Sequence, residues 1–176
     1  MGLNRCAIYL SHADVADALQ FLVRGSLLPE TIGEPRQVHD QSEIGDEEFG
    51  VTKEGDWVIV FADTAHFLDG ETLGLLKEWS KSRDIFMWLA QSTTAGMWFE
   101  MWRDGQLMRK WVEIEGVVEE NTGTELPQET PGYFDGSSRE DGRDEWSTSI
   151  LAGEITGVTI TRIFEMPFSV YVGRNG

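Results

Sequence analysis

The hydrophobic and polar positions at the start of the chain follow two different periods. Residues 4–11 form a short run rich in apolar side chains, which predicts a strand. Residues 12–25 follow, and their apolar positions at helical spacing are Val15, Ala18, Leu19 and Leu22. We expect Ser11 to cap this helix, with Asp14 three residues later as a weaker form of a capping box, and Gly25 to end it.

The next segments predict a hairpin and a second helix. Residues 26–48 contain two prolines and few large apolar side chains, so we expect a long connection with one short strand near 36–40. Residues 49–63 contain the turn KEGD between two strand patterns, and the run WVIVFA is typical of a central strand buried on both faces. Residues 69–84 predict a helix capped by Asp69, with an apolar stripe at Leu73, Leu76 and Trp79, and a strand follows at 84–91.

The stretch MWFEMWRDGQLMRKW, residues 97–111, predicts a second hairpin. Asp104 and Gly105 stand between two alternating runs, and this dipeptide favours a two-residue turn in which both residues have positive φ. A two-residue loop places Glu100 opposite Arg109 and Trp98 opposite Trp111, with a charged pair between aromatic layers.

Alternation then divides the hairpin into two faces. One face carries Trp98, Glu100, Trp102, Leu107, Arg109 and Trp111, and the other carries Met97, Phe99, Met101, Met108 and Val112. The Met/Phe face is continuous and apolar, so we expect it to lie in the core. The tryptophan face is covered either by a helix of the same chain or by a partner, and the sequence does not distinguish the two.

The last third of the chain changes composition. Residues 113–145 hold eleven acids against Arg139 and Arg143, and Gly, Pro, Ser and Thr are frequent, so we expect an acidic loop. Residues 145–157 predict a third helix with Ile150, Leu151 and Ile155 facing inward. Residues 158–173 predict one or two strands, interrupted near Pro167.

Together these elements predict a single α+β domain over residues 1–176. Its strands cluster in hairpins rather than alternating with helices, which favours a mostly antiparallel sheet of about six to eight strands with two or three helices packed on one face. Thirty-one acids against fourteen bases give a net charge of −17. Such a charge repels nucleic acid and anionic lipid and attracts cationic proteins, although it is also common in proteins that are simply soluble.

Candidate chemistry is sparse. Asp63, His66 and Asp69 are the nearest approach to a metal-ligand set, but a strand end and a helix cap explain both aspartates. The single cysteine, Cys6, lies in an apolar run and is expected to be a buried thiol. No phosphate-binding or nucleophile motif occurs, so we expect neither an enzyme nor a bound cofactor or metal. The absence of a leader pattern or an apolar span favours a soluble cytoplasmic protein.

The pattern DWVIVFAD, a helix, a strand, the hairpin RDGQLMRKW, then GTELPQE and EITGVTI resembles small bacterial immunity proteins that neutralise secreted toxins. The resemblance covers about Gly55 to Ile160 and implies a cytoplasmic inhibitor with a basic protein partner, but no residue roles. The alternatives are a nucleic-acid mimic that inhibits a defence or DNA-processing enzyme, and a small-molecule-binding or enzymatic domain with a pocket beside the tryptophan face.

We expect the partner to contact the tryptophan face and the start of the acidic loop. The predicted contact residues are Trp98, Glu100, Trp102, Arg109, Trp111, Glu113, Glu115, Glu119, Glu120 and Glu125. Aromatic anchors beside complementary charge are the usual composition of a tight protein interface.

Overall fold

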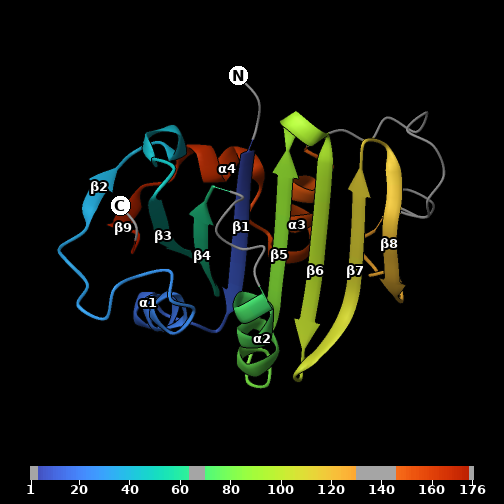
Figure 1. The fold of residues 1–176 in the computed structure, drawn as a ribbon, viewed down its shortest axis with the longest axis horizontal. Coiled ribbons are helices and arrows are strands. Elements are labelled where there is room, and N and C mark those ends of the chain that lie inside the picture. The colour runs from blue at the N-terminus through green and yellow to red at the C-terminus, as the bar shows by residue number, and fades with distance from the viewer. Residues whose placement is uncertain (1–3, 64–69, 130–145, 175–176) are drawn as a thin grey trace.

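The computed structural model is an α+β fold built on one open, nine-stranded antiparallel sheet (Figure 1). It describes residues 4–63, 70–129 and 146–174. The strands are β1 Asn4–Ser11, β2 Arg36–Val38, β3 Glu48–Glu54, β4 Trp57–Ala62, β5 Ile85–Gln91, β6 Gly96–Arg103, β7 Gln106–Ile114, β8 Val117–Gly123 and β9 Phe168–Val172. Their order across the sheet is β2-β9-β3-β4-β1-β5-β6-β7-β8. The predicted fold class is confirmed, with slightly more strands than expected.

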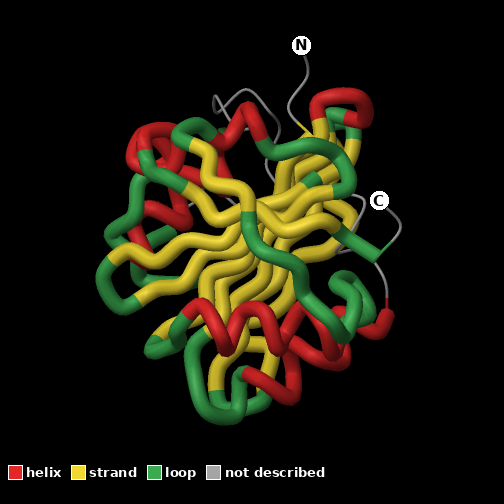
Figure 2. The backbone as a smooth tube through the Cα atoms, turned by 90° about the vertical axis from the view of Figure 1, so that its left-hand side faces the viewer, coloured by secondary structure: helices red, strands yellow, loops and turns green. Residues whose placement is uncertain are grey.

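The helices cover two faces of this sheet rather than the one face that the sequence suggested. Helix α1, Val15–Arg24, and helix α2, Gly70–Trp79, lie on the near side in Figure 1. Helix α3, Ser147–Thr156, and helix α4, Ile160–Glu165, lie on the far side. Figure 2, seen from the β2 end, shows helices on either side of the strands. We call these the α1 face and the α3 face. Two 3-10 turns, η1 at Gln41–Glu43 and η3 at Ser92–Thr94, complete the connections.

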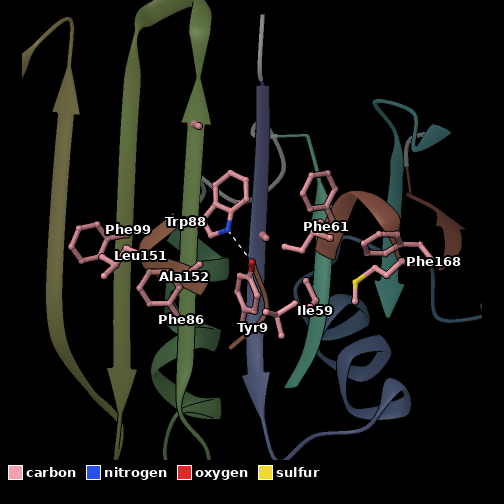
Figure 3. Packing of buried hydrophobic residues seen from close by; sticks show 14 of the residues in the cluster. Tyr9, Ile59, Phe61, Phe86, Trp88, Phe99, Leu151, Ala152 and Phe168 are labelled. Carbon is pink, nitrogen blue, oxygen red and sulfur yellow. Dashed lines mark hydrogen bonds between the residues drawn. The ribbon is translucent and has the colours of Figure 1, made fainter. Parts of the chain in front are cut away.

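Each face has its own hydrophobic core, because successive residues of a strand point to opposite sides. In β1, Ile8 and Leu10 face α1, while Ala7 and Tyr9 face α3. Figure 3 shows the core on the α3 face, where the Trp88 indole N–H donates to the Tyr9 hydroxyl over 3.3 Å. Burial raises the pKa of that hydroxyl, as expected for a phenol removed from water.

Several local predictions are confirmed. The pair β3–β4 is the expected hairpin, and β4 is buried from Val58 to Ala62 between β3 and β1. The short strand near 36–40 is β2 at the edge of the sheet, and α1 ends at Gly25. Its N-cap is Asp14 rather than Ser11. The Asp14 carboxylate accepts from the Asp17 N–H, and the Asp17 carboxylate accepts from the Asp14 N–H, so two aspartates form the capping box.

Three other predictions are wrong. Residues 160–165 form helix α4 instead of a strand, because the Thr159 hydroxyl caps the Arg162 N–H and starts a short helix. Residues 113–145 are not one loop, since they include the end of β7 and all of β8. In α3, Leu151 is buried as expected, but Ile150 is 54% exposed.

Some of the predicted segments and metal ligands lie outside the described residues. Residues 130–145, and with them much of the acidic segment, lie outside the described residues, as do His66 and Asp69. Within the described residues, no cluster of three potential metal ligands occurs. The described helices also include none that is both long and apolar enough to cross a membrane.

Candidate functional site

The hairpin formed by β6 and β7 begins as predicted and then changes register. Asp104 and Gly105 have φ values of 52° and 73°, so the expected turn is confirmed. The first pairs, including Trp102 opposite Leu107, also agree. Beyond them Met101 faces Arg109, because Met108 is an extra residue on β7 and forms a bulge.

The bulge reverses the facing of every residue of β7 beyond it. The predicted pairs Trp98–Trp111 and Glu100–Arg109 are therefore wrong. Trp98 faces Val112, Glu100 faces Lys110, and Phe99 faces Trp111 instead. Arg109 and Trp111 thereby move to the α3 face, while Lys110 and Val112 join the tryptophans on the α1 face.

The new register is stabilised by aromatic packing on the α3 face. Phe86, Phe99 and Trp111 come from three adjacent strands, and their rings stack in a row. The ring centroids are 5.9 Å apart for the first pair and 6.1 Å for the second. All three side chains are fully buried, and each burial removes a large apolar area from water. The predicted register would have left Trp111 on the other side of the sheet.

On the α3 face, the buried cation Arg109 is paired with and covered by residues that follow β8 in the same chain. Its guanidinium makes a two-pronged ion pair with Glu129, with Nε–Oε1 and Nη2–Oε2 distances of 2.9 and 3.0 Å. Its Nη1 donates to the Asn121 side chain and to the Thr122 carbonyl. Glu129 also accepts from the Leu126 N–H, so this pair fastens the segment after β8 against the sheet. Both side chains are buried, so their charges are compensated by each other and by these hydrogen bonds.

On the α1 face, the buried carboxylate Glu100 has a different environment. It accepts the indole N–H of Trp98 at 3.0 Å and that of Trp102 at 2.7 Å, one on each oxygen. The Lys110 ammonium lies 3.5 Å from Glu100 and 2.8 Å from Glu120, and 4.6 Å from the centre of the Trp98 ring. The two indoles thus hold a carboxylate just beneath the surface, and the lysine joins it to the acidic strand β8.

The α1 face of the sheet is covered unevenly. Helices α1 and α2 pack over the central strands, and α2 reaches only the turn end of the β6–β7 hairpin, where Gly105 lies against the last turn of α2 and the residues after it. In Figure 1, no described helix crosses the near side of β6, β7 and β8 away from that turn. We call this surface the open face. It carries Trp98, Trp102, Lys110, Val112, Ile114, Val117 and Glu120.

The open face exposes two neighbouring aliphatic side chains. Ile114 and Val117 face each other where β7 meets β8, and they are 44% and 58% exposed. Trp98 and Trp102 are each partly buried against the core of the α1 face. Contiguous apolar side chains with a polar rim are typical of a surface that is covered in a complex.

The acids predicted to contact a partner are divided by the fold. Glu113 is buried on the α3 face together with Arg109 and Trp111, so these three predicted contact residues are not on the surface. Glu115 lies in the tight turn between β7 and β8 with a φ of 52°. Glu119 and Glu125 are exposed, and Glu120 is partly exposed beside Lys110. The other predicted contact residues, Trp98, Glu100 and Trp102, do come together on the α1 face.

A small apolar cavity of about 140 Å³ adjoins the open face. Leu89, Trp98, Val112 and Ile114 line it, and Gly96 forms part of its wall. A larger cavity of about 570 Å³ lies at the opposite edge of the sheet beside β2 and β9, far from the tryptophans. The cavity beside the tryptophan face therefore has room for about one side chain.

The single cysteine, Cys6, is buried in β1. Burial raises the pKa of the Cys6 thiol well above its ordinary value, and the nearby Asp63 carboxylate adds to that increase, so the thiol is a poor nucleophile.

The important residue that sequence reasoning missed is Glu129. Its pairing with Arg109 depends on the bulge and on the path of residues 124–129, and no local pattern distinguishes it from the neighbouring acids.

Comparisons with known proteins add no relative. A scan against protein-family models, a search of curated proteins and a search of solved structures each found no match. Any functional conclusion therefore depends on the geometry of the chain itself.

Proposed function

We propose that this protein is an acidic, cytoplasmic inhibitor of the immunity type, which binds and neutralises a cationic toxin or enzyme domain. The observation that carries the proposal is the open face, where partly exposed tryptophans and exposed aliphatic side chains lie beside a carboxylate-rich strand. That combination supplies an apolar centre and a charged rim, the two components of a tight protein interface.

The charge distribution supports a cationic partner. Residues 113–129 contain six acids and no base, and four of these acids, Glu115, Glu119, Glu120 and Glu125, are not buried. They lie along β8 and its flanking segments, and Glu115 directly follows Ile114. Long-range attraction to this edge would raise the association rate with a basic protein, and screening by salt would lower it.

A binding role also fits the way the aromatic side chains are held. The indole N–H groups of Trp98 and Trp102 are both fixed by Glu100, so neither ring is free to rotate. A partner that packs on these rings would meet a surface whose side chains are already ordered, which reduces the entropic cost of association.

The test is a growth-rescue and binding experiment with the products of the neighbouring genes. Each product would be expressed in a bacterial host with and without this protein. We expect one cationic product to arrest growth, this protein to restore growth, and the purified pair to associate more slowly as salt rises. Neighbouring products that neither arrest growth nor bind would contradict the proposal.

Matched charge variants locate the interface. The triple variant E119Q/E120Q/E125Q removes three charges on and just after β8, and E30Q/E154Q/E165Q removes three from exposed positions elsewhere. We expect only the first variant to weaken binding and rescue strongly. Equal effects from both variants would show that total charge matters and that this edge is not the binding site.

A further inference from the structure

We infer that the open face recognises an apolar side chain flanked by basic residues, and that the apolar side chain enters the cavity between Trp98 and Ile114. This inference rests on the proposed function and specifies its partner: a cationic segment with one aliphatic or small aromatic anchor. The cavity, the exposed aliphatic pair beside it and the position of the acids each contribute a separate part of the argument.

The cavity has the size of one side chain. Its volume of about 140 Å³ is lined mostly by apolar atoms, and its wall includes Leu89, Trp98, Val112 and Ile114 together with the polar residues Gln91, Thr94 and Glu113. A volume of roughly 150 Å³ is enough to hold a molecule the size of benzene. A leucine, isoleucine or phenylalanine side chain therefore suits this site better than a charged one.

The mouth of the cavity opens onto surface that gains from being covered. Ile114 forms one wall of the cavity and is itself 44% exposed, and Val117 lies opposite it on β8. An anchor in the cavity would bring its own backbone over this pair and remove both from water. Each buried aliphatic side chain adds to affinity in proportion to the apolar area covered.

The acids lie where the residues flanking the anchor would pass. Glu120 is opposite Val112 across the β7–β8 ladder, and Glu115 follows Ile114 directly in the turn. Lys110 is already paired with Glu120, so the basic residues of the partner would meet Glu115, in the exposed turn beside Ile114. This charge complementarity selects a basic segment over a neutral or acidic one.

A two-by-two set of synthetic peptides tests the inference with the full-length protein. Four acetylated heptapeptides would carry leucine or serine at the centre, flanked on each side by three lysines or three glutamates. Binding would be followed by the indole N–H signals of Trp98 and Trp102 and the methyl signals of Ile114. We expect the lysine–leucine peptide to bind about tenfold or more tightly than the lysine–serine peptide, as burial of one leucine implies.

Salt separates the two components of the interaction. Raising ionic strength should weaken every lysine peptide, while the ratio between the leucine and serine peptides should stay nearly constant, because screening acts on charge and not on apolar burial. Equal binding of leucine and serine peptides, or perturbations confined to the cavity near β2 and β9, would overturn the inference.

Two variants and their controls complete the design. Ile114→Glu places a charge at the mouth, and Val112→Phe fills the cavity from within; both should abolish the preference for leucine. Ile150→Glu on α3 and Val172→Glu on β9 alter exposed aliphatic residues elsewhere and should leave that preference unchanged. Thermal unfolding checks that each variant is folded, and a folded Ile114→Glu protein that still prefers leucine would refute the inference.

The same variants distinguish this inference from the proposed function. If a cationic partner is neutralised and the rim variant E119Q/E120Q/E125Q loses it, but Ile114→Glu binds normally, the inhibitor function stands and the anchor cavity is wrong. If neither the peptides nor any cationic partner binds, both proposals fail.

Discussion

The two faces of strands β6–β8 handle buried charge in opposite ways. On the α3 face, Arg109 is paired with Glu129 and covered by the segment that follows β8. On the α1 face, Glu100 is held by two indole N–H groups and a half-buried lysine, and no described helix closes over it. One face is completed by the chain, and the other has ordered polar groups beneath a surface that stays accessible.

This difference indicates that the α3 face of these strands serves folding, while the open face is available for binding. Ion pairs that serve folding can be sealed, because their charges are compensated within the chain. A surface that serves binding has to remain open. The buried Glu100 carboxylate is therefore hydrogen-bonded by Trp98 and Trp102, which lie in the same strand, and not by a segment that covers the sheet. Variants of the two faces should therefore affect stability very differently.

The largest effect is expected on the closed face. Arg109→Met leaves Glu129 buried without its cation, so we expect the free energy of unfolding to fall by about 3–5 kcal/mol in urea denaturation. The double variant R109M/E129L removes both charges and should recover much of that loss. A loss below about 1 kcal/mol in the single variant would mean that this pair does not hold residues 124–129 against the sheet.

A smaller effect is expected on the open face. Glu100→Gln keeps the shape of the side chain, but its amide NH₂ group cannot accept the second indole N–H. We expect a loss of about 1–3 kcal/mol, the usual range for an unsatisfied buried polar group. The indole N–H signals of Trp98 and Trp102 should separate in their shifts. If this variant were as destabilising as Arg109→Met, the contrast between the faces would be wrong.

A carboxylate on helix α1 provides a pH-dependent reference away from strands β6–β8. The pKa of Asp17 is lowered, first by the Asp14 N–H that it accepts and also by Arg83. A lowered pKa stabilises the fold above the ordinary aspartate value and loses that contribution as pH falls through the folded value. We expect Asp17→Asn to cost about 0.3–1 kcal/mol near neutral pH.

That difference should shrink as pH falls below about 3.9, where the aspartate of the unfolded chain is protonated. Parallel urea titrations of the wild type and the variant at several pH values would measure it. A difference that is constant down to acidic pH would exclude the charge as its source.

The smallest effect is expected from the exposed aliphatic pair. Val117→Thr and Ile114→Thr keep the β-branched shape at positions that are about half exposed, so stability should change by no more than about 0.5 kcal/mol. Urea denaturation of both variants would check this. A larger loss would indicate that the pair supports folding rather than binding.

Much of the fold follows from local pattern, and the open face follows only in part. The run WVIVFA identifies β4 as a central strand, and Asp104–Gly105 identifies the turn, because both signals are confined to a few neighbouring residues. Residues 160–165 mislead, because Ile and Thr favour strands while the cap at Thr159 and packing of Ile163 favour a helix.

The site itself depends on contacts that sequence order does not reveal. Trp98, Glu100 and Trp102 were placed correctly on one face, since alternation within a single strand is reliable. Arg109 and Trp111 were placed on the wrong face, because the bulge depends on stacking with Phe99 and on Glu129, twenty residues away in the chain.

The extra residue at Met108 decides which face of the sheet the side chains of β7 occupy. Counting from the turn, an odd or an even number of residues decides whether Trp111 and Arg109 point into the α3 face or onto the open face. A deletion of one residue at this point would exchange the two rows of β7 while leaving the composition almost unchanged. Two chains that differ by this single position could thus look nearly identical when aligned and yet present different surfaces, so the length of β7 carries as much information about binding as the identity of its side chains.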